Sequence, residues 1–313
     1  MPTVSVIIPT YNRAALLQRA VESAKHAGSD LEIIVVDDAS TDNTYEVCRH
    51  LSGIRYVRLT RNEGLAGARN AGVLASSAQF VAFLDDDDLR LPRSLDSQIR
   101  ALEASPASAF CYGQLLFADA SRQLPTGEII PIRCPVGDIF WNLLEQNFVP
   151  VGSVVARKQT LIDFDLFTAG LGGVEDWHLW LRIAEVWPVA AVEEPVVIYR
   201  RANRHSGQMC SDSVSMYRQM LLVQEMALRL PRAAAAPRAK RHRTRVNLLK
   251  LVYNALIAEA SEALAEGDRE AARVKSREAL NLRPFRARTD LSLLRLLWSP
   301  WIDSTLKLKG FPS

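Results

Sequence analysis

The first hundred residues predict an α/β fold, a three-layer sandwich with a mainly parallel central sheet between helices. Short apolar, β-branched runs alternate there with segments of helical spacing, an order typical of parallel sheets. The chain has 313 residues, 48% hydrophobic and 23% charged, which is enough for one large domain with an appendage. These proportions exclude a disordered, collagen-like or disulfide-scaffold protein.

Apolar runs that end at polar residues mark the strands of this body. Val4 to Ile8 is almost continuously apolar and stops at Pro9, as expected for a strand covered on both faces. The Pro- and Gly-rich segment 124–137 is expected to be a loop over the functional site. Further strands are expected at 31–36, 54–59, 80–84, 109–117, 153–156 and 196–199, and helices at 14–25, 42–50, 65–74, 94–102, 141–146, 175–186 and 211–230.

The composition changes after residue 230, where we place a domain boundary. Residues 1–230 hold 21 basic and 27 acidic side chains, whereas 231–313 hold 17 basic and 8 acidic ones. The Ala- and Pro-rich segment 231–237 predicts a linker, and 248–264 and 269–282 predict two amphipathic helices. We therefore expect a body followed by a basic α-helical extension, a partly repeat-like hairpin. A single repeat unit cannot form a stable array, so the hairpin should pack on the body.

The cysteines and the N-terminus bear on the cellular compartment. Cys48, Cys111, Cys134 and Cys210 lie far apart without paired metal-ligand spacing, which favours buried thiols in a reducing compartment. The chain starts with a predicted strand instead of a signal peptide. No apolar run approaches the ~18–20 residues of a membrane-spanning helix. We therefore expect a cytoplasmic protein.

Three predicted strands end in polar residues. The first is followed by Pro-Thr-Tyr-Asn-Arg, the second by Asp37-Asp38 and the fourth by Asp85 to Asp88. Ligands bind beyond the carboxyl ends of parallel strands, so these groups should share one site. Repulsion between so many carboxylates requires a counter-charge, and Mg²⁺ or Mn²⁺ with a substrate diphosphate fits. The phosphate-binding and dinucleotide-binding glycine motifs are absent, which argues against a P-loop nucleotidase and a nicotinamide dehydrogenase.

Five segments stand in a fixed order over about residues 3–205. They are 4–13 (VSVIIPTYNR), 32–42 (EIIVVDDASTD), 62–72 (NEGLAGARNAG), 83–88 (FLDDDD) and 173–177 (GVEDW). Together they resemble the motifs of glycosyltransferase family 2. The resemblance implies the GT-A fold, a nucleotide-sugar donor, a divalent metal ion and inversion at the anomeric carbon.

The resemblance also implies roles in binding the donor. Asp38, together with Asp37, would accept hydrogen bonds from the nucleobase, taken here as uracil. Arg13 would face the phosphates. Arg69 would bridge the acidic loops of the nucleotide-sugar site or form a purely structural ion pair. The nucleoside pocket would be lined by Pro9, Thr10 and Tyr11.

The metal site implied by the resemblance is the Asp-x-Asp formed by Asp85 and Asp87, with Mn²⁺ or Mg²⁺ as the cofactor. Asp87 would be the direct ligand and Asp86 would lie near the ribose, while Asp88 would support the ligands or cap a helix. His205 would complete the metal site or contact the diphosphate; alternatively it is a histidine of a surface loop. The stretch around His205 departs from the family's spacing by about two residues.

Inversion requires a carboxylate that deprotonates the acceptor hydroxyl as it attacks. We assign this role to Asp176, because the start of a helix stabilises an ionised carboxylate, with Glu175 as the alternative. Both would otherwise be ordinary acids of a first helical turn. Trp141, Trp177 and Trp180 would stack on sugar rings or belong to the core.

The extension bears on the acceptor. Its segment 238–245 holds five basic residues, and two tryptophans follow at 298 and 301. Such a surface suits the anionic cytoplasmic face of the inner membrane and a lipid-linked acceptor, or is a solvated helix face. No recognised module accompanies the charge, so we expect no nucleic-acid partner.

The sequence thus predicts transfer of a sugar from a nucleotide-diphosphate sugar, taken as a UDP-sugar, to a hydroxyl of a glycan or lipid-linked acceptor. Surface polysaccharide or glycolipid biosynthesis would be its setting. A nucleotidyltransferase would instead require a Gly-rich basic loop after the first strand. A non-catalytic scaffold that uses its C-terminal helices would predict a damaged acidic site, yet Asp85, Asp87 and Asp176 are present. The identity of the sugar is not encoded in any segment we recognise.

Overall fold

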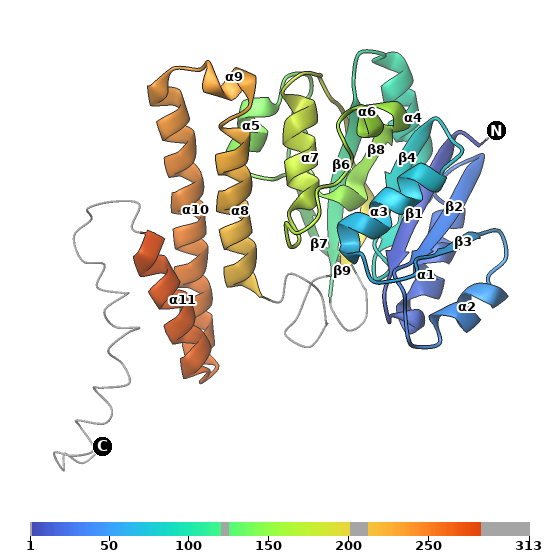
Figure 1. Ribbon diagram of the computed structural model, residues 1–313, viewed down its shortest axis with the longest axis horizontal. Helices are drawn as coiled ribbons and strands as arrows, with labels where there is room; N and C mark the ends of the chain where they lie inside the picture. The colour runs from blue at the N-terminus through green and yellow to red at the C-terminus, as the bar shows by residue number, and fades with distance from the viewer. Residues whose placement is uncertain (1, 120–124, 201–211, 283–313) are drawn as a thin grey trace, which may run out of the picture.

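One sheet with helices on both faces forms the body of the protein (Figure 1). The computed structural model describes residues 2–119, 125–200 and 212–282, and within these the sheet has nine strands. The strands are β1 (Val4–Thr10), β2 (Leu31–Asp37), β3 (Arg55–Arg58), β4 (Phe80–Phe83), β5 (Leu89–Arg90), β6 (Phe110–Ala118), β7 (Pro125–Ile130), β8 (Val154–Arg157) and β9 (Ala190–Arg200).

The first half of the sheet is parallel and the second half is mixed. The strand order is β3-β2-β1-β4-β8-β6-β9-β5, and β7 pairs with β6 beside this path. Within the group β1 to β4 every pair of neighbouring strands is parallel, because a helix carries the chain back between consecutive strands. Strand β8 is antiparallel to β4 and β6, whereas β9 is parallel to β6. The expected α/β fold with a mainly parallel sheet is confirmed.

Two apolar cores lie on opposite faces of this sheet. Strand β1 serves both, since Val6 and Ile8 belong to one core and Ile7 to the other, which explains its continuous apolar run. The first core is closed by α1 (Ala14–Lys25), α2 (Thr44–His50) and α4 (Ser94–Ala104). The second is closed by α3 (Gly64–Ala75), α5 (Phe140–Glu145), α6 (Lys158–Asp163) and α7 (Glu175–Ala184).

Three expectations about local structure differ from the structure. The segment 124–137 was expected to be a loop, but Pro125–Ile130 forms β7 because β6 supplies its hydrogen-bonding edge. The linker expected at 231–237 contains a short helix, α9 (Pro231–Ala234), with proline in its first turn. The next helix, α10 (Arg238–Ala265), begins ten residues before the expected 248, because its Arg, Lys and Ala residues favour a helix without an apolar stripe.

The C-terminal helices pack on the second core. Leu248, Val252 and Leu256 recur every four residues on α10 and are fully buried in the same core as Trp177. Gln224 of α8 (Ser213–Ala227) links this layer to the body, because its side-chain amide donates to the carbonyls of α5 and α10 at 3.0 and 3.2 Å. Helix α11 (Arg269–Leu282) pairs with α10 as a hairpin, and the boundary at residue 230 stays a prediction.

Among the described helices, none is both long and apolar enough to cross a membrane.

Candidate active site

The polar strand ends meet at one edge of the sheet. Thr10 at the end of β1 is in register with Asp37 at the end of β2, and β4 ends two residues before the acidic run 85–88. The chain's start marks the upper edge of the sheet in Figure 1, so these carboxyl ends lie at the lower edge. The parallel arrangement therefore gathers the predicted residues of three strands into one site.

The carboxylates that follow β2 are held by the fold. Asp37 is fully buried and accepts hydrogen bonds from the hydroxyl of Tyr56 and from the backbone N–H of Ser40, the latter at 2.7 Å. Asp38 accepts from the backbone N–H of Glu63 at 2.7 Å, and burial raises its pKa. Both carboxylates thus lie at the carboxyl end of β2, where the protein's own N–H and O–H groups hold them, and their role towards a nucleobase stays a prediction.

Arginines neutralise part of the acidic run. The guanidinium of Arg13 lies 3.2 Å from Asp86 and 3.3 Å from Asp87, and that of Arg200 lies 2.6 Å from Asp87. The hydroxyl of Thr10 donates to Asp86 at 2.7 Å. Burial nevertheless raises the pKa of Asp86 to about 7, so the surrounding cations do not fully offset desolvation.

Arg69 ties the acidic run to the second acidic pair. Its side chain is only 2% exposed, and its two terminal nitrogens lie 2.7 Å from Glu175 and 2.8 Å from Asp85. The other oxygen of Glu175 accepts from the backbone N–H of Gly173 at 2.9 Å. Arg69 therefore joins α3, the end of β4 and the start of α7 into one rigid cluster, the bridge between acidic loops that the sequence suggested.

Asp176 lies beside this cluster in a different environment. One of its oxygens accepts from the backbone N–H of Val151 at 3.2 Å, and the other from its neighbour Trp177 at 2.6 Å. Asn147 approaches at 3.5 Å. Burial, and then the charge of Glu175, raise the pKa of Asp176 to about 7, although Arg69 and these N–H groups oppose the shift. A carboxylate that titrates near neutrality suits a general base.

The remaining predicted residues differ in how exposed they are and in whether the structure describes them. Pro9 is buried within β1, and Tyr11 is 46% exposed at the site's rim. His205 lies outside the described residues. Trp177 and Trp180 are fully buried, so stacking on a sugar is wrong for both; Trp141 is partly exposed beneath the ammonium of Lys240.

Sequence reasoning missed two neighbours of the carboxylates. Arg200 was given no role from the sequence, yet it pairs with Asp87 and donates its backbone N–H to Asp88 at 2.8 Å. The excess of acids was the signal that should have prompted a search for basic partners. Asn147 beside Asp176 had no such signal.

The donor set fits a hard divalent ion with few protein ligands. Within the described part of the chain no three His, Cys, Asp or Glu side chains form a metal cage. Mg²⁺ and Mn²⁺ need only one or two carboxylates when phosphates and waters complete the shell. The buried Asp88 has a pKa raised by burial and by neighbouring carboxylates, which indicates a local excess of negative charge. The residues present therefore fit such an ion at Asp85 and Asp87.

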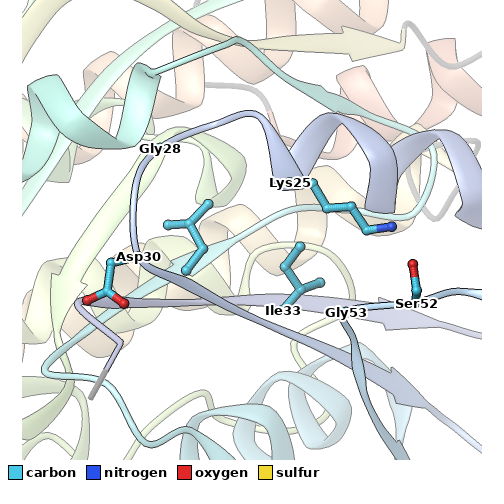
Figure 2. Close-up of a pocket in the computed structure, with 7 residues that line it drawn as sticks. Lys25, Gly28, Asp30, Ile33, Ser52 and Gly53 are labelled. Carbon is cyan, nitrogen blue, oxygen red and sulfur yellow. The ribbon is translucent and has the colours of Figure 1, made fainter.

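An open hollow elsewhere on the molecule does not belong to this site. Figure 2 shows it between the end of α1 and the start of β2, where Lys25, Asp30 and Gly53 contribute to its lining. Its volume is about 340 Å³, but it lies at the amino edge of the sheet and contains none of the predicted site residues.

Comparison with known sequences identifies the family. The sequence model of glycosyl transferase family 2 matches residues 5–159. The UDP-Glc:alpha-D-GlcNAc-diphosphoundecaprenol beta-1,3-glucosyltransferase WfgD of Escherichia coli is 31% identical over 193 residues, 60% of this chain and 72% of that protein. The chain belongs to glycosyl transferase family 2.

Other relatives are matched over a smaller share of their own length. Validoxylamine A glucosyltransferase of Streptomyces hygroscopicus subsp. jinggangensis is 40% identical over 215 residues, which cover 62% of this chain and 48% of that protein. An uncharacterised glycosyltransferase of Rickettsia felis is 29% identical over 61% of this chain. This chain spans only about a third, 32%, of the Rickettsia protein's length.

Solved structures confirm the GT-A-like fold. Staphylococcus aureus TarS residues 1–349, in complex with UDP-GlcNAc, aligns with a TM-score of 0.63 at 17% identity, covering 88% of this chain and 81% of that one. The mannosyltransferase PcManGT of Pyrobaculum calidifontis, in complex with GDP-Man and Mn²⁺, aligns with a TM-score of 0.55 at 19% identity over 95% and 88% of the two chains.

Proposed function

We propose that this protein is a metal-dependent, inverting glycosyltransferase that moves a sugar from a UDP-sugar to a hydroxyl of a glycan or lipid-linked acceptor. The cluster centred on Arg69 carries the proposal. It fixes Glu175, the neighbour of Asp176, to Asp85 at the start of the acidic run. A candidate base and a candidate diphosphate site thereby share one rigid frame.

The proposed reaction is a single displacement. Asp176 takes the proton of the acceptor hydroxyl while its oxygen attacks the anomeric carbon, and the nucleoside diphosphate leaves from the opposite face with inversion. Arg13 and Arg200 place positive charge beside the acidic run, where they would also stabilise the departing diphosphate. Glu175, engaged by Arg69, holds the start of α7 in place.

Asp85 and Asp87 would hold Mn²⁺ or Mg²⁺ in this scheme. Such an ion stabilises the negative charge that grows on a leaving diphosphate. Support comes from the unbalanced carboxylates and from the Mn²⁺ in the related mannosyltransferase structure. His205 as a third ligand stays a prediction.

Relatives guide the choice of substrates to try. Two are glucosyltransferases by name, and TarS was solved with UDP-GlcNAc, so UDP-glucose and UDP-GlcNAc are the first donors to test. The Escherichia coli relative is named for a diphosphoundecaprenol-linked acceptor, whereas the Streptomyces relative is named for validoxylamine A. We propose the lipid-linked class, for a protein that works at the cytoplasmic face of the membrane. A soluble acceptor is the competing outcome.

The basic start of α10 bears on membrane contact. Arg238, Arg243 and Arg245 are exposed there, and Arg245 pairs with the last turns of α8. In Figure 1 the start of α10 lies at the top of the view, whereas β9 runs towards the lower part, and its last residue, Arg200, pairs with Asp87 of the acidic run. Contact with an anionic bilayer would therefore hold the protein at the membrane through the end away from the site. Co-sedimentation with anionic vesicles, compared with neutral ones, tests this contact.

A thermal-shift panel tests the donor site. UDP, GDP, dTDP and CMP are each added with and without Mn²⁺, because a ligand that binds only the folded protein raises its melting temperature. UDP should stabilise the protein, and more strongly with Mn²⁺. Stabilisation by none of the four nucleotides would contradict the proposed function.

A further inference from the structure

Arg90, at the end of β5, is a buried cation without a buried anion. Its residue is 2% exposed, and within the described chain no carboxylate forms an ion pair with it. Burial lowers its pKa to about 9. Burying an uncompensated charge is costly. We therefore expect the hydrogen bonds of the Arg90 guanidinium to have a structural role that an apolar side chain could not fill.

Those hydrogen bonds hold one short turn. The turn is the 3₁₀ segment Val151–Ser153, which joins Pro150 to β8. Arg90 donates to the carbonyl of Gly152 at 2.7 Å, and its other terminal nitrogen donates to the side-chain oxygen of Gln98 at 3.0 Å. The amide nitrogen of Gln98 in turn donates to the carbonyl of Ser153 at 2.7 Å. Two consecutive carbonyls of the turn are thus fixed from β5 and α4.

The other side of the same turn faces Asp176. The backbone N–H of Val151 donates to one oxygen of Asp176 at 3.2 Å. Val151, which carries this N–H, directly precedes Gly152, whose carbonyl Arg90 holds, and one peptide unit separates the two groups. Gly152 also packs close to the acidic run, since a Cβ added there would meet an oxygen of Asp88 at 3.9 Å. Tilting the turn would therefore move the Val151 N–H away from the carboxylate.

We propose that Arg90, braced by Gln98, is a positioning residue that sets the direction of the Asp176 carboxylate through the turn Val151–Ser153. The inference rests on the proposed function in taking Asp176 as the base. Arg90 touches no substrate in this scheme. It acts on the orientation of the base, and an error of about 1 Å in such a geometry costs on the order of 100-fold in rate.

The first test is the kinetics of Arg90→Met with UDP-glucose, or with the donor that the binding panel selects. The rate is measured as the UDP that is released when the sugar is transferred to water or to an acceptor. We expect kcat to fall by at least about 10-fold. The donor KM should stay within about two-fold, because Arg13 and Arg200 still hold the acidic run. Arg157→Met is the matched control. Arg157 also donates to two backbone carbonyls, at 3.0 and 2.9 Å, but it does so at the end of β8 that lies away from the site. Its kcat should stay unchanged.

The second test is a double-mutant cycle with Val151→Pro, which deletes the N–H. Pro150 has ψ 142°, a value that a following proline requires, and proline is tolerated at the first position of a helical turn. If Arg90 acts through this N–H, the double variant should be no slower than Val151→Pro alone. If the two losses multiply, Arg90 acts by another route and the proposal is wrong.

The outcomes separate this inference from the proposed function. Wild-type kcat in a folded Arg90→Met, with Asp176→Asn inactive, would overturn the role of Arg90 and leave the function standing. Full activity of Asp176→Asn would overturn both. If Arg90→Met does not fold, Gln98→Leu replaces it in both tests, because Gln98 holds the adjacent carbonyl. The same losses are expected for it, and wild-type kcat would again refute the role of the brace.

Discussion

Replacing Asp176 by Asn should stop sugar transfer and should make the unliganded protein steadily more stable relative to wild type as pH rises from 5 to 8. Asp176 has a pKa raised to about 7 by burial, against about 3.9 in an unfolded chain. Between these values the folded protein keeps a proton that the unfolded chain has lost. The stability that comes from the neutral carboxyl is present at low pH and is lost as pH rises towards 7.

The magnitude follows from the two pKa values. Each pH unit in this window removes about 1.4 kcal/mol from the free energy of unfolding, so the wild type loses about 3 kcal/mol between pH 5 and pH 8 through this group. Asparagine does not titrate. It can accept from Val151 or from Trp177 but not from both, which costs about 1–3 kcal/mol at every pH. The change with pH is therefore the diagnostic quantity.

Urea unfolding at pH 5, 6, 7 and 8 in EDTA measures it. The stability of Asp176→Asn relative to wild type should rise by about 3 kcal/mol from pH 5 to pH 8. Asp163→Asn, at an exposed position, should follow the wild type at every pH. A difference between Asp176→Asn and wild type that does not change with pH would refute the assignment of a neutral-range pKa. Turnover should fall by about 10²–10⁴-fold if Asp176 is the base.

Three further variants address the rest of the account. Arg69→Met should lower the free energy of unfolding by about 3–5 kcal/mol in urea titrations, because it leaves Asp85 and Glu175 without their buried cation; a loss below about 1 kcal/mol would contradict that. Asp87→Ala should abolish the extra thermal shift that Mn²⁺ gives with UDP, and an unchanged Mn²⁺ effect would exclude Asp87 as a ligand. Glu259→Gln should speed tryptic cleavage of the α10–α11 hairpin without changing UDP binding, because Glu259 joins Tyr217 of α8 to Lys275 of α11; equal cleavage rates would argue against this role.

The parallel half of the fold was predictable from local sequence. Strands buried on both faces are continuously apolar, so Val4–Thr10, Leu31–Asp37 and Phe80–Phe83 lie within about two residues of the expected ranges. The meeting of the acidic strand ends at one site was also predictable, because the parallel register brings Thr10 beside Asp37. Strand β7 was not predictable, since its partner β6 supplies its order and its own side chains are mostly exposed.

The electrostatic partners of the site were only partly predictable. The acidic run 85–88 indicated a missing positive charge, and a metal ion was the natural inference. The structure adds guanidinium groups from α3 and from the end of β9. The hydrophobic pattern of the sequence does not indicate that the end of β9 lies beside the acidic run, so the contact of Arg200 with Asp87 could not be predicted. The turn that contacts Asp176 is held by hydrogen bonds from β5 and α4 to the residues just before β8. These elements are distant in the sequence, so a local sequence pattern does not predict the contacts.

The most direct test of the central claim is UDP release from UDP-glucose and UDP-GlcNAc with Mn²⁺, comparing wild type, Asp176→Asn and Asp163→Asn. An undecaprenyl-diphosphate GlcNAc acceptor and validoxylamine A are added in separate reactions. The account predicts that wild type and Asp163→Asn release UDP with at least one donor, faster with the lipid-linked acceptor, and that Asp176→Asn binds UDP but releases almost none. Equal release by Asp176→Asn and wild type would contradict the account.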